Sequence, residues 1–420
     1  MTKNYIIRAG KNPFLAASAI ETLNSNLTMT NVGNLLFQHA FIRSIHSADT
    51  NVITVHDQVM PDETIDKINK NIDAVYLPFA NAFRPTFRGG LHNWIQMIDK
   101  IKVPVVVVGI GAQCETDNAM LELASINDDV RLFCNKVLSR SQSIGVRGEF
   151  TANYLNDLGI KNVDIVGCPS MFYHGKHLPK AALPLPENMK KVAFNFSPQS
   201  PANLGALNAN VDLELTEIRR LMQLTPEATF DYFAQDTNEL AHQIWGSKQV
   251  TLSSMCEELT HIRTRYPIDV HQWIKDLQAY DLSIGTRIHG CIAAVLAGIP
   301  SVMLCHDSRT RELAQWFELP RLDKTTGAYT LTMDSISECL QASKMQAVFQ
   351  ERYQTYIGFL KKNKIEHHFE KCKAEPACFA GYDEKITLAN LPETLDNKPE
   401  NFDFLNEKIN YLYQAMAKKR

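Results

Sequence analysis

Short apolar runs alternate along the chain with longer amphipathic stretches. The short runs predict strands over residues 51–55, 74–79, 103–109, 143–146, 163–166, 192–196, 229–234, 282–284 and 301–304. The longer stretches predict helices over residues 35–46, 90–100, 149–158, 213–224, 241–246, 271–280 and 291–297. This alternation is typical of βαβ units, in which helices cover a parallel sheet. The pattern therefore predicts an α/β fold.

Residues 174–190 break the alternation with three prolines and little periodicity, which indicates a linker. We therefore expect two Rossmann-like domains in tandem with a central cleft, an N-terminal one over 1–180 and a C-terminal one over 190–330. A helical tail over 331–420 should follow, and its last helix either docks on the body or lies on a membrane surface. Ligands of such folds bind beyond the carboxyl ends of the strands, so the residues after each strand are the site candidates.

Composition narrows the class of protein. The 420 residues carry 43 Lys and Arg against 46 Asp and Glu, and 45% of them are hydrophobic, as in ordinary soluble globular proteins. A nucleic-acid binder would usually carry a basic surplus, so no nucleic-acid partner is expected. The longest apolar run, Cys291–Cys305, is short for a membrane span and is broken by Gly-Ile-Pro. The N-terminus has no signal-peptide pattern, so we expect a cytoplasmic protein, with peripheral contact at the inner membrane face left open.

The cysteines do not predict a metal site. The nine cysteines are scattered and mostly lie in apolar stretches, which favours reduced core thiols over disulfides. Cys372 and Cys378 follow His367 and His368, but this spacing is not one of the usual zinc patterns. We therefore predict no metal ligands and no cofactor, and the sequence leaves a requirement for a divalent metal open.

The strongest chemical signal lies between Tyr280 and Leu304, where a short strand, a turn, a helix and a second strand follow one another. Arg287 and His289 are two residues apart, and Gly290 opens the helix. An arginine at a helix N-terminus can bind a carboxylate or phosphate, and a histidine beside it can donate a proton near neutral pH. The alternative is an arginine and a core histidine that only shape the turn.

Polar residues after other predicted strands extend the candidate site. Asp307 and Arg309 follow the next strand, where Ser308 or Asp307 would cap a helix and Arg309 could face the cleft. In the N-terminal half the candidates are Arg84 and Arg88 in one loop, Gly111 in the turn GIGAQ, and Arg147 at a strand end. Each of these could instead have only a backbone role. The turn at Gly111 has two of the three glycines of a dinucleotide fingerprint, so NAD binding is not predicted.

Four segments, taken in order, resemble the polysaccharide pyruvyl transferase family. They are Asn31-Val-Gly-Asn34, similar to an Asn-x-Gly-Asp turn, Ser143–Leu158, similar to a Val-Arg-acid segment with its helix, Gly167–Phe172, similar to an Asp-Pro-Ala-Phe element, and Thr286–Pro300, similar to an Arg-x-His-Gly and Gly-x-Pro signature. Members of this family are GT-B-like two-domain enzymes. They transfer a pyruvyl group from phosphoenolpyruvate to a sugar of a surface polysaccharide or its precursor, which forms a ketal.

The resemblance implies roles for the candidate residues. Arg287 would bind the donor's carboxylate or phosphate, with Arg147 as a second donor-binding arginine, and His289 would donate the proton. Gly290 and Arg309 complete the donor set on the C-terminal domain, while Asn31, Gly33, Asn34, Arg84, Arg88 and Gly111 form the acceptor side of the cleft. The nearest acids in sequence, Asp281 and Asp307, are the candidates for a base that takes a hydroxyl proton.

The chain departs from the family pattern at two acids. Asn34 stands where many members have Asp, and Cys168 replaces the Asp of the Asp-Pro element. Two other functions therefore stay open, a GT-B nucleotide-sugar glycosyltransferase and a non-catalytic glycan-binding protein. A glycosyltransferase would usually carry Glu-Gly where this chain has His289-Gly290, which favours an acid catalyst. The acceptor sugar, its linkage to a lipid and the oligomeric state are not encoded in any motif.

Overall fold

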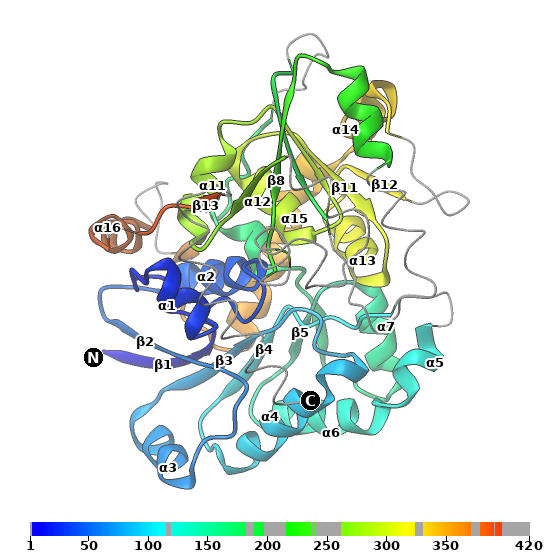
Figure 1. Cartoon of the computed structure of the whole chain (residues 1–420). Coiled ribbons are helices and arrows are strands. Elements are labelled where there is room, and N and C mark those ends of the chain that lie inside the picture. The colour runs from blue at the N-terminus through cyan, green and yellow to red at the C-terminus, as the bar shows by residue number, and fades with distance from the viewer. Residues whose placement is uncertain are drawn as a thin grey trace, which may run out of the picture.

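The computed structural model describes residues 2–114, 119–181, 189–196, 216–236, 239, 262–323, 331–370, 379–389 and 391–396 (Figure 1). Two layered α/β units follow one another, one blue to cyan and the other green to yellow in Figure 1. Each is built on a sheet of mostly parallel strands with helices on its faces. The predicted fold class, two Rossmann-like domains in tandem, is confirmed. The boundaries proposed for the domains stay a prediction.

The first sheet has the strand order β2-β1-β3-β4, and a separate pair β5-β6 continues it through a bridge between Ile110 and Val146. All its strands pair in parallel, with Tyr5 opposite both Val52 and Ala74. The strands are β1 (Lys3–Arg8), β2 (Thr50–Val55), β3 (Ala74–Pro78), β4 (Val105–Val108), β5 (Ile144–Val146) and β6 (Val163–Ile165). The helices are α1 (Ala19–Asn24), α2 (Gly33–Ile45), α3 (Asp62–Asn71), η1 (Pro85–Phe87), α4 (Arg88–Lys100), α5 (Ala119–Ala124), α6 (Asn127–Leu138), α7 (Glu149–Asp157) and η2 (Pro169–Phe172).

The second sheet has the order β12-β11-β10-β7-β8-β9-β13 and is parallel except for its edge strand β13. Its strands are β7 (Lys191–Asn195), β8 (Thr229–Phe233), β9 (Arg263–Tyr266), β10 (Leu282–Gly285), β11 (Ser301–Cys305), β12 (Arg321–Asp323) and β13 (Leu395–Asp396). The helices are residues 216–224, α11 (Val270–Leu277), α12 (Ile288–Ala297), α13 (Ser308–Trp316), α14 (Met333–Ala342), α15 (Met345–Lys362), η5 (His368–Glu370) and α16 (Ala380–Leu388).

Helix α2 holds the two units together. Its apolar residues share one buried core with α11, α12, η2 and α15, so this core belongs to both halves of the chain. Beside it, the ammonium of Lys11 donates to Ile268 O (3.3 Å) and to the carboxylate of Asp269 (3.4 Å), which also caps α11. The side chains of Lys11 and Asp269 are 0% and 1% exposed, so the pair is a buried charge contact between segments far apart in sequence.

The nine predicted strands are found within two residues of their expected ends, but the sequence analysis missed β1, β9, β12 and β13. The omission of β1 matters because this strand lies between β2 and β3 in the first sheet. The helix predicted over 241–246, the end of the tail and the two cysteines of the C-x5-C motif lie outside the described residues. Within the described ranges, no helix combines the length and the apolar character needed to cross a membrane.

Replacing Lys11 with methionine should destabilise the protein, because it leaves the carboxylate of Asp269 buried without its cation. Removal of one member of a buried ion pair costs about 3–5 kcal/mol. Urea unfolding followed by fluorescence measures this loss, and Lys67→Met, at an exposed helical ion pair with Glu63, is the matched control. The control should change stability by less than about 0.5 kcal/mol. Equal effects of the two variants would show that Lys11 does not hold the units together.

Candidate functional site

A cleft of about 370 Å³ opens between the two units and is lined by residues from both. Its most prominent lining groups are cationic or can become so: Arg8, Arg84, Arg147, Arg287, His289 and Arg309. Amide side chains and aromatic rings make up much of the remaining wall: Asn31, Asn34, Phe37, Phe79, Asn81, Phe87 and Gln235. Asp57 and Asp236 also line the cleft, but the cationic side chains outnumber them, so the lining is suited to a small, strongly anionic ligand.

Arg287 is placed by the turn between β10 and α12. Its backbone is extended, and its amide N–H donates to the side-chain oxygen of Asn195 at the end of β7 (3.0 Å). The guanidinium donates through Nε to Phe196 O (2.8 Å) and forms an ion pair with Glu239. Glu239 in turn accepts from the hydroxyl of Tyr232 (3.0 Å). These contacts fix the guanidinium at the cleft wall.

Gly290 is required by a close approach of side chains. A Cβ atom at this position would lie 2.4 Å from Gln235 Nε2 and 2.7 Å from the side-chain amide of Asn195. Asn195 also holds the amide of Arg287, so crowding at Gly290 would disturb the turn that carries the arginine. The glycine in the Arg-x-His-Gly sequence therefore has a packing reason in this chain.

His289 lies at the buried edge of the cleft, with 8% of its surface exposed. Its ring packs on Phe37 of α2, with 5.3 Å between ring centroids, and its Nε2 lies 3.6 Å from Cys168 Sγ. Burial lowers the pKa of His289 well below its ordinary value, and the nearby charges of Arg147 and Arg309 lower it further. The imidazole is therefore neutral at pH 7 in this surrounding, and an anion that offsets the arginines would raise its pKa.

Arg147 is completely buried at the end of β5 and still lines the cleft. Its Nε donates to Gly109 O (3.0 Å) and its Nη2 to Cys168 Sγ (3.9 Å). Its Nη1 has no hydrogen-bond partner among the described residues. An unpaired buried guanidinium nitrogen is costly, and an anionic ligand in the cleft would satisfy it. Gly111 allows this arrangement because a Cβ there would lie 2.9 Å from Arg147 Cδ.

Asp307 supports Arg309 and does not line the cleft. One carboxylate oxygen caps α13 by accepting from Thr310 N (2.8 Å), and the other lies 3.2 Å from Arg309 Nη2. Burial raises the pKa of Asp307, but the charges of Arg309 and His306 and the hydrogen bonds from Thr310 outweigh it and lower the pKa overall. Its oxygens are thus used in holding an arginine and a helix end, so the expected role of general base is corrected.

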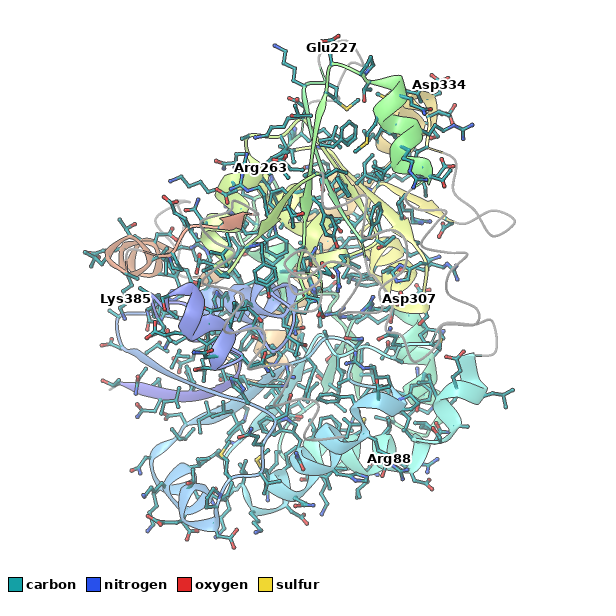
Figure 2. All side chains as sticks on the ribbon, in the orientation of Figure 1. Arg88, Glu227, Arg263, Asp307, Asp334 and Lys385 are labelled. Atoms are coloured by element: carbon teal, nitrogen blue, oxygen red, sulfur yellow. The ribbon has the colours of Figure 1, made fainter. Side chains whose placement is uncertain are left out.

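Two further expectations from the sequence are corrected: Asp281 as a base and Arg88 as a cleft residue. Asp281 accepts from the amides of Lys190 and Lys191 (2.8 Å each), which places it at the amino end of the sheet, away from the cleft at the carboxyl ends. Arg88, at the start of α4, is 54% exposed and forms an ion pair with Asp129 (2.7 Å) (Figure 2). Neither Asp281 nor Arg88 is among the residues that line the cleft.

The Asn31–Asn34 turn does reach the cleft. The side chain of Asn31 accepts from Gly33 N (2.8 Å) and that of Asn34 donates to Met29 O (3.1 Å), so both amides brace the start of α2. A Cβ at Gly33 would lie 2.9 Å from His289 Cβ, so the turn lies against the catalytic candidate. Arg84 also reaches the cleft, and its pKa is lowered to about 10 by burial and by the charges of Arg309 and Arg8.

Arg8 is a site residue that the sequence analysis missed. It ends β1, makes a bidentate ion pair with Asp57 (2.6 Å from both Nε and Nη2) and lies 4.4 Å above the ring of Phe79. Asp57 also accepts from the indole N–H of Trp94 (2.7 Å). A polar residue directly after the apolar run Tyr5-Ile-Ile was the available signal, because it marks the carboxyl end of a strand.

The comparison with protein families decides the membership of the chain. A family model described as polysaccharide pyruvyl transferase matches residues 31–308. The chain belongs to this family. The match covers the Asn31 turn, Arg147, Arg287 and His289, while Arg8 and Arg309 lie outside it. A comparison with curated protein sequences gave no match.

Among solved structures, the chain is similar to three proteins at low identity. The UDP-GlcNAc 2-epimerase of Methanocaldococcus jannaschii, in complex with UDP-GlcNAc and UDP, is 10% identical over 86% of this chain and 99% of that chain (TM-score 0.44). The S. aureus MnaA–UDP co-structure is 13% identical over 94% and 99% (TM-score 0.43). The α,α-trehalose 6-phosphate synthase of Burkholderia multivorans is 8% identical over 100% and 99% (TM-score 0.39).

Substituting Gly290 with alanine should destabilise this pyruvyl transferase family protein, because the new Cβ would collide with Gln235 and Asn195. Overpacking of this kind costs about 1–3 kcal/mol. The control is Gly358→Ala in α15, where nothing lies within 4 Å of the new Cβ. The control should stabilise the helix by about 0.5–1 kcal/mol. Thermal unfolding of both variants checks the opposite signs, and a stabilised Gly290→Ala variant would contradict the packing argument.

Proposed function

We propose that this protein transfers a pyruvyl group from phosphoenolpyruvate to two hydroxyls of a sugar and forms a ketal. The observation that carries the proposal is the buried guanidinium of Arg147, whose Nη1 is unsatisfied among the described residues at the wall of an arginine-rich cleft. Phosphoenolpyruvate has a phosphate and a carboxylate close together, and arginines bind both groups with bidentate, charge-assisted hydrogen bonds.

The donor site of this proposal is formed by Arg147, Arg287 and Arg309, with Gly290 allowing the turn its close approach. The acceptor sugar lies toward Asn31, Asn34 and Arg84 on the other wall of the cleft. A cleft of about 370 Å³ lies within the ~300–1,000 Å³ range of small-molecule sites. We place the enzyme in the cytoplasm, with a free or lipid-linked sugar precursor as its acceptor.

The reaction uses protonation of the donor as its first step. A proton from His289 reaches the methylene carbon of phosphoenolpyruvate, and the neighbouring carbon becomes an electrophile that a sugar hydroxyl attacks. A second hydroxyl of the same sugar then displaces phosphate and closes the ketal, and its proton leaves with the phosphate. The arginines stabilise the negative charge that grows on the leaving phosphate. We assign no cofactor to this sequence of steps.

The runner-up is a glycosyltransferase that uses a nucleotide sugar. The His289-Gly290 pair disfavours it, because a histidine with a lowered pKa next to two arginines is less suited to hold a ribose than a carboxylate would be. A glycan-binding protein without catalysis is the third possibility. A function in glycan binding alone does not explain why His289 lies beside Arg147 and Arg309.

Calorimetric titration with phosphoenolpyruvate and with nucleotide sugars tests the proposal. We expect the wild type to bind phosphoenolpyruvate and no nucleotide sugar. Arg287→Lys keeps the charge near Glu239 but loses the planar fork, and it should weaken binding by about 10- to 100-fold, equal to the 1.5–3 kcal/mol of a charged hydrogen bond. Arg88→Lys, at an exposed arginine outside the cleft, is the matched control and should bind as the wild type does.

Two outcomes of this titration would contradict the proposal. Binding of a nucleotide sugar in place of phosphoenolpyruvate would favour the glycosyltransferase. Loss of phosphoenolpyruvate binding in the Arg88→Lys control, with no change in Arg287→Lys, would place the donor site elsewhere on the protein.

A further inference from the structure

Cys168 lies beneath the cleft, in contact with the two residues on which the proposed chemistry depends. The thiol is fully buried between β6 and η2, and its Sγ is 3.6 Å from His289 Nε2. The hydroxyl of Ser170 donates to the sulfur (2.9 Å), and Arg147 Nη2 approaches it at 3.9 Å. The sulfur thus accepts from two donors, which leaves its own proton available for the imidazole.

One of the two neutral tautomers of the ring lets Nε2 accept from the thiol. When Cys168 S–H donates to His289 Nε2, the neutral imidazole carries its proton on Nδ1. Nδ1 is on the side of the Asn31 turn, because a Cβ at Gly33 would lie 3.1 Å from it. Asn31 lines the cleft, so Nδ1 lies toward a cleft-lining turn and Nε2 faces the sulfur.

We propose that Cys168 and His289 form a proton relay that acts first as the acid and then as the base of the transfer. Cys168 is the positioning and proton-supplying residue, and His289 is the group that touches the donor. This inference rests on the proposed pyruvyl transfer.

Each proton of the relay has a source and a destination. The Nδ1–H bond of His289 breaks as its proton forms the new C–H bond at the methylene carbon of phosphoenolpyruvate. The S–H bond of Cys168 breaks at the same time, and its proton moves to Nε2, which leaves a thiolate and a neutral imidazole of the other tautomer. The proton of the attacking sugar hydroxyl then moves to Nδ1, and the Nε2 proton returns to the sulfur. The pair ends in its starting state, with the hydroxyl oxygen bonded to carbon.

The surroundings of His289 favour a proton relay over an imidazole that is already protonated before the reaction. Among the described residues, the charged or titratable groups that face His289 are Arg147, Arg309 and Cys168. The positive charges of the two arginines disfavour protonation of the ring and lower the pKa of His289. Arg147 Nη2 and the Ser170 hydroxyl already point at the sulfur, so they would stabilise the thiolate that the relay creates. Tyr356 of α15 also faces Cys168, as a neutral phenol whose pKa is raised by burial.

The relay also supplies the base that neither Asp281 nor Asp307 can provide. Asp281 lies at the other end of the sheet, and Asp307 is used in holding Arg309 and α13. Cys168 stands where the family resemblance places an aspartate, and a carboxylate there would pair with Arg147 and His289 as an ion. A thiol is neutral and can lose a proton, so it changes the chemistry of the position and not only its shape.

Steady-state kinetics on Cys168 variants tests the relay. We expect Cys168→Ala and Cys168→Ser to lower kcat by about 100-fold, the low end for loss of a general acid–base group, with the KM for phosphoenolpyruvate nearly unchanged. Serine fails because an alcohol is a far weaker acid than a thiol. Cys168→Asp should recover part of the activity with an altered pH profile, because its carboxylate raises the pKa of His289. The rate should then fall as the pH rises through that pKa.

Cys134→Ala is the matched control, since Cys134 is a fully buried thiol in α6 and is not a cleft residue. It should leave kcat unchanged. Equal kcat values for Cys168→Ala and Cys134→Ala would overturn the relay. So would a pH profile of Cys168→Asp that matches that of the wild type. Thermal unfolding of each variant separates a lost relay from a lost fold.

A second measurement does not depend on turnover. The ¹⁵N chemical shifts of the His289 ring, assigned with a His289→Asn variant, should show the Nδ1–H tautomer in the wild type and in Cys134→Ala, but not in Cys168→Ala. An Nε2–H tautomer in the wild type would overturn the relay even if the enzyme is active. A wild type that neither binds nor turns over phosphoenolpyruvate refutes the proposed function, while the spectra still decide whether Cys168 sets the tautomer.

Discussion

The structure around the cleft depends on keeping five arginine side chains close together against their mutual repulsion. Buried or half-buried carboxylates make this possible, because each binds one arginine. Arg8 is held by Asp57, Arg287 by Glu239 and Arg309 by Asp307. Arg84 and Arg147 have no carboxylate within ion-pair distance among the described residues. The cleft is therefore organised as a cationic wall whose charge an anionic ligand completes.

The two-domain frame supplies these carboxylates from different parts of the chain. The carboxyl ends of both sheets face the cleft, and α2 packs on both units behind it. A second bridge crosses between α13 and α7, where the carboxylate of Glu312 accepts from Thr151 N (2.9 Å) and its hydroxyl (3.0 Å). Burial raises the pKa of Glu312 to about 7, so this bridge changes its charge near neutral pH. This bridge therefore joins α7, which follows Arg147, to α13, which carries Arg309.

Those site residues that lie close together in sequence could be predicted, and those that depend on distant contacts could not. Arg287, His289 and Gly290 share one strand–turn–helix unit, so their spacing alone indicated that they meet a ligand together. Arg8 was missed because the run that forms β1 was not recognised as a strand, although it lies inside the sheet. Its partner Asp57 is 49 residues away, so only the fold shows the pair.

The two misplaced acids show a different limit. Asp281 was chosen for its nearness to Arg287 in sequence, but the strand between them carries the two residues to opposite ends of the sheet. Strand polarity alone excludes Asp281, because it precedes its strand and the ligands of such folds bind at the other end. Asp307 follows a strand as a site residue should, but it also precedes a helix, and a helix N-terminus takes a carboxylate as its cap. No pattern in the sequence tells which of these two uses a given aspartate will serve.

The exclusion of both acids as bases changes what the departures from the family pattern mean. If Cys168 only filled the volume of an aspartate, Arg147 would be buried beside a neutral group that does nothing for its charge. A thiol that can ionise gives Arg147 a partner at the moment when His289 releases its proton, and a neutral neighbour before and after. The replacement of Asp by Cys thus moves the negative charge from a permanent feature of the site to a transient one, and the arginine wall stays free to bind the anionic donor in between.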